Sequence, residues 1–176
     1  MALSKVDGTN FVDPTLPVAS GGTGITSGFV NGLDGWSSSS GNILSADASK
    51  GIYLGVNSAT ADNLLDDYEE GDWTPGLSVS SSGNSGTYVK VGSLVLAKFK
   101  VVPTASGTNV TIDSFPFTSD SGFEQQGLAR ETESAGNLWF IRMPASSTSA
   151  TIYRYDASNS IDANDTFEGQ LIYQTA

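Results

Sequence analysis

The feature that most constrains this chain is a change of pattern between Asp62 and Pro75. Before this stretch the sequence is rich in Gly, Ser, Asn and Asp, and its apolar residues are scattered. From Leu77 to the C-terminus, apolar and polar residues alternate in short runs, which is the period of half-buried β-strands. The sequence therefore predicts a low-complexity arm followed by a compact β domain.

Short predicted strands follow one another at fairly even intervals, separated by clusters of turn residues, and Gly92-Ser93 has the length of a tight hairpin connection. Such a series without intervening helices predicts an all-β fold, a jelly-roll-like antiparallel β-sandwich or a related Greek key. The predicted strands are 87–91, 94–102, 110–112, 122–130, 137–143, 148–155 and 167–174. The expected core residues are Val89, Val91, Leu94, Leu96, Phe99, Val101, Ile112, Phe115, Phe117, Leu128, Leu138, Phe140, Ile152, Phe167 and Ile172.

Residues 59–68 are the one segment with helical spacing, because three apolar residues there form a narrow face. Gly71 is a suitable residue to end this helix. We therefore predict three parts: an extended, Gly/Ser-rich N-terminal arm over 1–60, a short acidic helix and linker over 61–72, and a C-terminal β-sandwich head over 73–176. The predicted helix-to-head junction consists of Leu64, Leu65, Tyr68, Trp73 and Pro75.

Three features of the first half each have a functional and a structural interpretation. The acidic residues between Asp62 and Asp72 suggest either a calcium site or a solvated acidic face, and their spacing does not fit an EF-hand. The glycines between Ala19 and Gly24 lack the strand, helix and lysine of a phosphate loop and indicate a connector. Trp73 is either a ligand platform or a plug that seats the predicted helix against the sandwich. We favour the structural interpretation in each case and predict no metal and no cofactor.

The composition excludes most catalytic chemistry. The chain has no cysteine and no histidine, so it cannot form a Ser-His-Asp triad or a cysteine–zinc site. A depolymerase with two carboxylates remains as an alternative, but no pattern pairs two of them, and we predict that the protein is not an enzyme. The formal net charge of −11 argues against binding to nucleic acid or to an anionic membrane. No apolar run has the length of a signal peptide or a membrane span, which predicts synthesis in the cytoplasm.

Five segments of the chain carry a resemblance to a known family: 16–24, with Leu16, Pro17, Val18, Gly21, Gly22 and Gly24, then 66–75, 86–92, 113–118 and 164–173. They resemble the C-terminal regions of fibre-like virion proteins of tailed bacteriophages, especially of marine phages. The matches follow the same order along the chain, and the Tyr-Glu-Glu-Gly element is the most specific of them. Asp72 departs from the family pattern, in which threonine is usual, and the chain is short for a main tail fibre.

The resemblance implies a homotrimer in the virion, made in the host bacterial cytoplasm, whose heads pack about a threefold axis. Residues 16–24 would then help attach the arm to other virion proteins. A trimer also suits the arm, whose apolar residues have too little surrounding sequence to cover them. We expect a short trimeric fibre or appendage with a projecting β head. The alternatives are a head that recognises a bacterial surface glycan and a capsid decoration protein. The residues expected to contact a glycan are Trp139, Arg142, Tyr153 and Tyr155.

Overall fold

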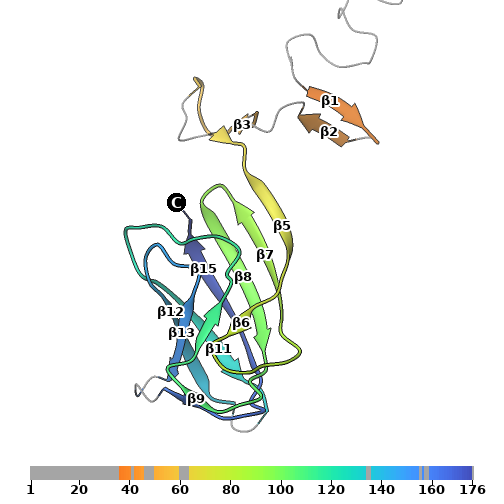
Figure 1. Cartoon of the computed structure of the whole chain (residues 1–176). Helices are drawn as coiled ribbons and strands as arrows, with labels where there is room; N and C mark the ends of the chain where they lie inside the picture. Colours follow the sequence, from red (N-terminus) through yellow and green to blue (C-terminus); the bar gives the residue numbers. More distant parts are fainter. Residues whose placement is uncertain are drawn as a thin grey trace, which may run out of the picture. The chain divides into compact units, whose positions relative to one another are not determined.

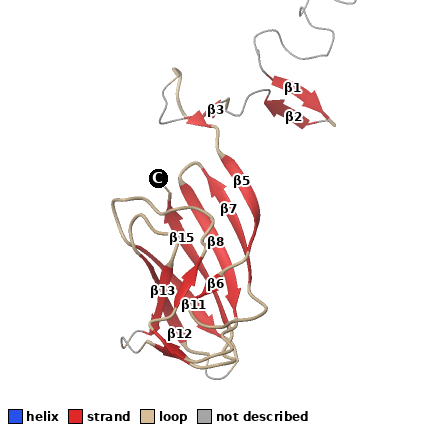
Figure 2. Cartoon of the chain, in the orientation of Figure 1, coloured by secondary structure: helices blue, strands red, loops and turns tan. Residues whose placement is uncertain are grey.

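The structure is a computed structural model that describes residues 36–40, 42–45, 50–59, 64–133, 136–154, 156 and 159–175. The chain divides into two compact units, Met1–Asp66 and Asp67–Ala176, and we call the second unit the head. All regular elements in the described ranges are strands, as Figure 2 shows. The prediction of an all-β fold is confirmed.

The first unit contains two small antiparallel ladders. β1 (Trp36–Ser39) pairs with β2 (Asn42–Ser45), and β3 (Ile52–Tyr53) pairs with β4 (Leu64–Leu65). Gly51 allows the second ladder to close, because a Cβ there would lie 2.2 Å from the carbonyl oxygen of Leu65. Residues 1–35, which include the glycine-rich segment 16–24, lie outside the described residues.

The head is built around one antiparallel sheet of nine strands in the order β5-β7-β8-β15-β11-β12-β13-β10-β6 (Figure 1). A separate ladder joins β9 to β14. The strands of the head are β5 (Tyr68–Trp73), β6 (Gly76–Leu77), β7 (Ser85–Val91), β8 (Leu94–Val101), β9 (Gly107–Thr108), β10 (Thr111–Asp113), β11 (Gln125–Glu131), β12 (Leu138–Met143), β13 (Ala150–Arg154), β14 (Ser160–Ile161) and β15 (Phe167–Gln174).

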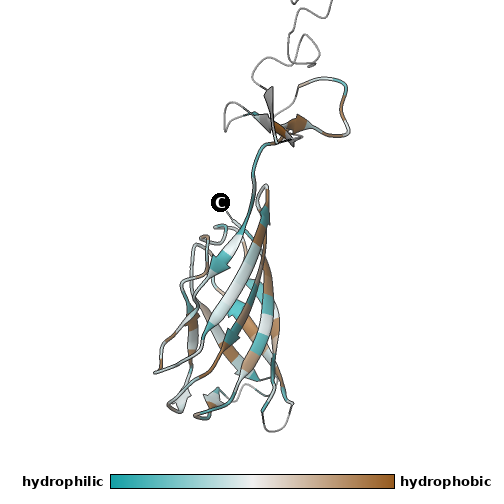
Figure 3. Cartoon of the chain, turned by 90° about the vertical axis from the view of Figure 1, so that its right-hand side faces the viewer, coloured by the Kyte–Doolittle hydropathy of each residue, from teal (hydrophilic) through white to brown (hydrophobic). Residues whose placement is uncertain are grey.

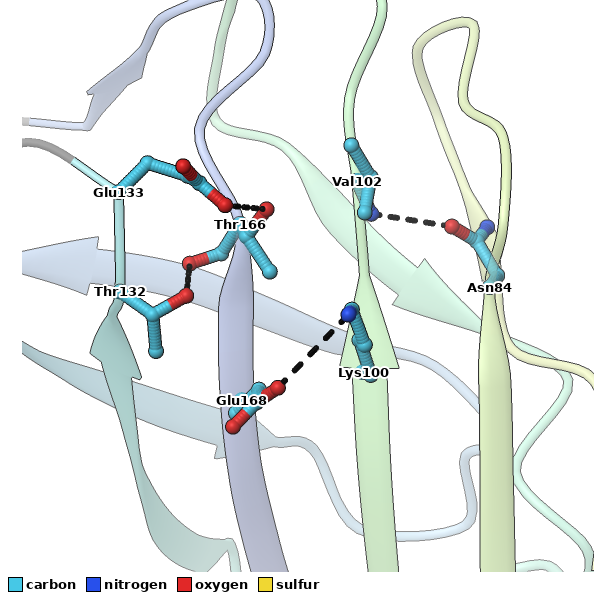
Figure 4. A network of polar contacts seen from close by, with 7 residues as sticks. All are labelled: Asn84, Lys100, Val102, Thr132, Glu133, Thr166 and Glu168. Carbon is cyan, nitrogen blue, oxygen red and sulfur yellow. Dashed lines mark hydrogen bonds and ion pairs between the residues drawn. The ribbon is translucent and has the colours of Figure 1, made fainter.

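The sheet curls until its two halves face each other across one core, as in a β-sandwich. Its edge strands, β5 and β6, are separated in the sequence only by Thr74 and Pro75, so the two edges meet at this corner. The amide of Asn84 secures the corner. Its Nδ2 donates to the carbonyl oxygen of Pro75 at 2.9 Å, and its Oδ1 accepts from the N–H of Val102 at 3.0 Å (Figure 4).

The predicted helix over 59–68 is wrong for the described residues of that segment. Leu64 and Leu65 form β4, and the six residues of β5 begin at Tyr68 and pair along β7. Two causes explain the difference. Acidic residues four apart repel each other on a helix, and the ladder with β7 supplies backbone hydrogen bonds that outweigh a weak local preference. Trp73 therefore ends a strand and does not follow a helix.

The interior of the head is lined by alternate residues of the long strands, which places the core between the two halves of the sheet. Phe99, Val101, Ile112, Phe115, Ile152 and Phe167 are buried, as predicted. On several strands, the residues predicted for the core lie on the outward face, so this part of the prediction is wrong. The exposed or half-buried members of the predicted core on these strands are Val89, Val91, Leu94, Leu96, Leu128, Leu138, Phe140 and Ile172. The fully buried residues in their place include Val95, Ala97, Trp139, Ile141, Met143, Leu171 and Tyr173. Phe117 is half-buried and packs against the core.

Several polar groups inside and at the rim of the head have partners. Lys90 is 8% exposed and pairs with Asp67, and its Nζ lies 5.3 Å from the centroid of the Phe117 ring. The hydroxyl of Tyr173 donates to the carbonyl oxygen of Phe117 at 3.2 Å. Burial raises the pKa of Tyr173 to about 12, although the hydrogen bond that its oxygen accepts from the N–H of Phe117, at 3.3 Å, lowers it. This tyrosine is therefore neutral in the core at physiological pH.

Candidate functional site

The best candidate for a ligand site is a pocket of about 330 Å³ on the outside of β12 and β13. Its walls are formed by Asn109, Arg142, Thr151, Tyr153 and Asn159. Alternation along the strands places three of these residues on one face, because Arg142 stands opposite Thr151 and Tyr153 is two residues further along β13. The two asparagines come from loops. The pocket therefore combines residues that are far apart in the sequence.

The two asparagines are held together by the pairing of β9 with β14. Ser160 stands opposite Thr108 in this ladder, so the residue before β14 meets the residue after β9. Asn159 Nδ2 donates to Asn109 Oδ1 at 2.7 Å, and the N–H of Asn109 donates to the carbonyl oxygen of Asn159 at 3.0 Å. Asn109 has a φ of 53°, a left-handed conformation that asparagine tolerates better than most residues. The amide oxygen of Asn159 is buried and has no hydrogen-bond partner among the described residues.

The strand side of the pocket supplies an aromatic surface and a cation. The Tyr153 ring stacks on the Phe140 ring, with centroids 5.8 Å apart and planes 23° from parallel. The Arg142 side chain is about half exposed, and its guanidinium lies 3.8 Å from a carboxylate oxygen of Glu124. An aromatic face beside hydroxyl, amide and guanidinium groups is able to stack on a sugar ring and hydrogen-bond its hydroxyls.

The four residues predicted to contact a glycan do not all lie at one site. It brings Arg142 and Tyr153 into one pocket, and Tyr155 lies outside the described residues. Trp139 is fully buried, so its predicted contact with an external ligand is wrong. The reason is strand alternation: Trp139 precedes Phe140 and faces the core, where its ring meets Phe167 edge-on at 5.2 Å. The guanidinium carbon of Arg154 lies 4.7 Å from the centroid of the Trp139 ring.

Sequence reasoning missed Asn109, Thr151 and Asn159. Thr151 lies two residues before Tyr153 on a predicted strand, so the alternation that places Tyr153 also places Thr151 on the same face. The two asparagines lie in turn-rich segments that carry no signal of a site. They meet only because the short β9–β14 ladder joins segments about 50 residues apart.

A larger pocket of about 560 Å³ lies beside Trp73, among residues of β5, β7, β8 and β15. The Trp73 indole is already engaged within the head. Its Nε1 donates to the carbonyl oxygen of Lys98 at 3.2 Å, and its ring lies 4.9 Å from that of Phe115. Gly86 makes room for the ring, because a Cβ there would come within 2.3 Å of Nε1. Trp73 and the buried Pro75 thus help to close the corner between β5 and β6.

Two carboxyl groups of the head, those of Glu131 and Asp165, lie in environments at least partly shielded from solvent. Glu131 is buried, and its Oε2 accepts a hydrogen bond from Asn137 Nδ2 at 3.1 Å. Burial raises the pKa of Asp165, and the negative charges of Glu131 and Asp162 raise it further. Neither Glu131 nor Asp165 lines the two pockets described above. In the described ranges, no three metal-ligating side chains cluster to hold an ion, and no helix has the length and apolarity to cross a bilayer.

Comparison of the chain with protein-family models, with curated proteins and with solved structures found no match. The function is therefore inferred from the sequence resemblance and from the surfaces of the molecule.

Proposed function

We propose that this chain is a structural protein of a tailed-bacteriophage virion, a short homotrimeric fibre or appendage with a projecting β head. Residues 1–60 form its attachment arm and contact other virion proteins. The proposal is supported by the ordered series of fibre-like segments between Leu16 and the C-terminus. A capsid decoration protein is a variant of the same proposal, with the arm attached to the head shell and not to the tail.

The observation that carries the proposal is the exposure of apolar side chains in the first unit. Where burial is described there, no residue is buried. The large exposed apolar residues are Ile43, Ile52, Tyr53, Leu54 and Val56. Two-stranded ladders of this length are not stable alone in water, so an arm of this kind needs further chains to cover its apolar residues. Sister copies and a virion surface both meet this need.

Sedimentation of the full chain tests the proposal. We expect a trimer, and we expect the double variant Ile52→Asp, Leu54→Asp to dissociate at concentrations where the wild type stays associated, because it places charges on apolar positions. Ser58→Asp adds a charge to an exposed residue of the same segment and serves as the control. A wild-type chain that remains monomeric at all accessible concentrations would contradict the proposed assembly.

A second candidate function is recognition of a bacterial surface glycan by the head. It is favoured by the pocket in which Arg142 and Tyr153 meet Thr151 and two asparagine amides. The two functions are compatible, because a fibre that binds its host is both a structural protein and a binding protein. Three heads in one fibre would also add avidity to a weak site.

The glycan site is tested on an array of bacterial surface polysaccharides. For any glycan that the wild type binds, we expect Tyr153→Ala and Arg142→Ala each to weaken binding by about tenfold or more, because each removes a central contact. Arg130→Ala is the matched control, since Arg130 is an exposed arginine outside this pocket. Equal binding by all three variants would show that another surface holds the glycan. Failure of the wild type to bind any glycan would leave the structural role alone.

A further inference from the structure

One end of the outer surface of the head carries a continuous group of apolar side chains on β5, β7, β8 and β15. Two rows of strand partners build it. Tyr68, Val91 and Leu94 stand side by side in one row, and Val89, Leu96 and Ile172 do so in the next. We call these six residues the outer apolar patch. Figure 3, turned toward the β5 and β7 side, shows hydrophobic and hydrophilic residues following one another along the strands of the head.

The patch is exposed although the core of the head is complete without it. Tyr68 is 63% exposed, Ile172 52% and Leu94 51%, whereas Val95 and Ala97, which follow Leu94 and Leu96 on β8, are fully buried. The uncovered parts of the six side chains amount to on the order of 300 Å² when typical burial areas are used. An apolar surface of about this size is in the range of the largest patch on a typical soluble monomer, and such patches are often contact sites.

The charges around the patch are arranged to suit a second copy. Glu70 stands beside Val89 at the β5 edge of the patch, and Asp72 and Lys98 lie in the next row, on either side of Thr87. Lys98 forms no ion pair within the described part of the chain, whereas Lys100, further along β8, pairs with Glu168 at 3.9 Å. A copy rotated about an axis beside the patch would bring Glu70 and Asp72 of one head toward Lys98 of the next. Such self-complementary borders favour association despite a net charge of −11.

The area of the patch suits the centre of an interface with a second copy. A standard interface buries about 800 Å² per partner, with an apolar centre and a polar rim. The outer apolar patch supplies such a centre, and the flanking glutamate, aspartate and lysine residues supply the rim. We propose that the outer apolar patch is the surface through which the heads of neighbouring copies pack against each other. This inference rests on the proposed homotrimer and adds the location of its contact in the head.

The absence of cysteine from the chain permits a direct test in the full-length protein. Leu94→Cys places a thiol in the patch, and Leu138→Cys places one on β12, outside the patch. The two leucines are equally exposed in a single chain, at 51% and 52%. We expect the thiol at position 94 of the assembled protein to react with a maleimide at least about tenfold more slowly than an exposed cysteine. The reason is that the reagent reaches this thiol only when the contact between the heads opens. The thiol at position 138 should react at the rate of an exposed cysteine.

The oligomeric mass of each variant, measured on the same samples, separates the outcomes. Equal labelling rates in an oligomer would overturn the proposed contact in the head and leave assembly through the arm intact. A monomer with equal labelling rates would overturn both this inference and the proposed homotrimer. A monomer in which only position 94 is protected would show that residues 1–60 of the same chain cover the patch, which also overturns the inference.

A charge in the patch gives an independent measurement. Leu94→Glu should shift the association equilibrium toward smaller species by about tenfold or more, because a carboxylate is costly to bury without a partner. Leu138→Glu adds the same charge to an equally exposed position and should leave the association unchanged. If Leu138→Glu weakened association and Leu94→Glu did not, the contact would lie on the β12 side, which would contradict the inference.

Discussion

Replacing Trp139 with alanine is expected to lower the free energy of unfolding by about 3–5 kcal/mol, the range for a large aromatic residue deleted from a core. The side chain is fully buried and meets the Phe167 ring edge-on at 5.2 Å. Its loss also removes the aromatic surface beneath the Arg154 guanidinium. Equilibrium unfolding in denaturant, with the transition followed by circular dichroism, measures the effect.

Trp139→Phe provides a graded comparison. The indole Nε1 has no hydrogen-bond partner in the described part of the chain, so phenylalanine removes volume without breaking a hydrogen bond. We expect it to cost about 1–2 kcal/mol, less than alanine, in proportion to the smaller cavity. An alanine variant that keeps full stability but loses binding to a glycan would contradict the buried position and restore Trp139 as a ligand contact.

Replacing Gly169 with alanine is expected to cost about 3 kcal/mol, at the upper end for an overpacked core. Gly169 stands between Phe99 on β8 and Ala129 on β11. An added Cβ would lie 2.6 Å from the carbonyl oxygen of Leu128, 2.6 Å from Cζ of Phe99 and 2.7 Å from Cβ of Ala129. Because one of these atoms belongs to the backbone of the neighbouring strand, a simple side-chain rotation cannot relieve the overlap.

Two further variants test the cause of this loss. Gly76→Ala is the control, since its new Cβ would come no closer than 3.5 Å to the Cβ of Asp113, and we expect a change within about 0.5 kcal/mol. Adding Phe99→Leu to Gly169→Ala should cost less than the sum of the two single changes, because the smaller side chain relieves one of the overlaps. Strict additivity would show that the ring of Phe99 does not limit this position.

The strands of the head were largely predictable, because alternation and turn residues are local signals. The segment 167–174 is a strand with the predicted bounds, and the hairpin at Gly92-Ser93 forms as expected. The helix prediction failed where the local signal was weak and a ladder with a distant strand decided the conformation. In the candidate site, Arg142 and Tyr153 could be proposed from their residue types on predicted strands. Asn109 and Asn159 could not, because only the β9–β14 ladder brings them together.

The residue pattern alone predicts that the head is all-β and where its long strands run, since a period of two residues and its interruptions are local properties of the chain. Which face of each strand is buried depends on how the sheet closes in three dimensions. In β8, the residues Leu94, Val95, Leu96 and Ala97 are all apolar, so alternation there cannot distinguish inside from outside. The curl of the sheet, which brings β5 and β6 together at Thr74 and Pro75, determines which residues of β8 are buried. It enclosed Val95 and Ala97 in the core and left Leu94 and Ile172 on the outside.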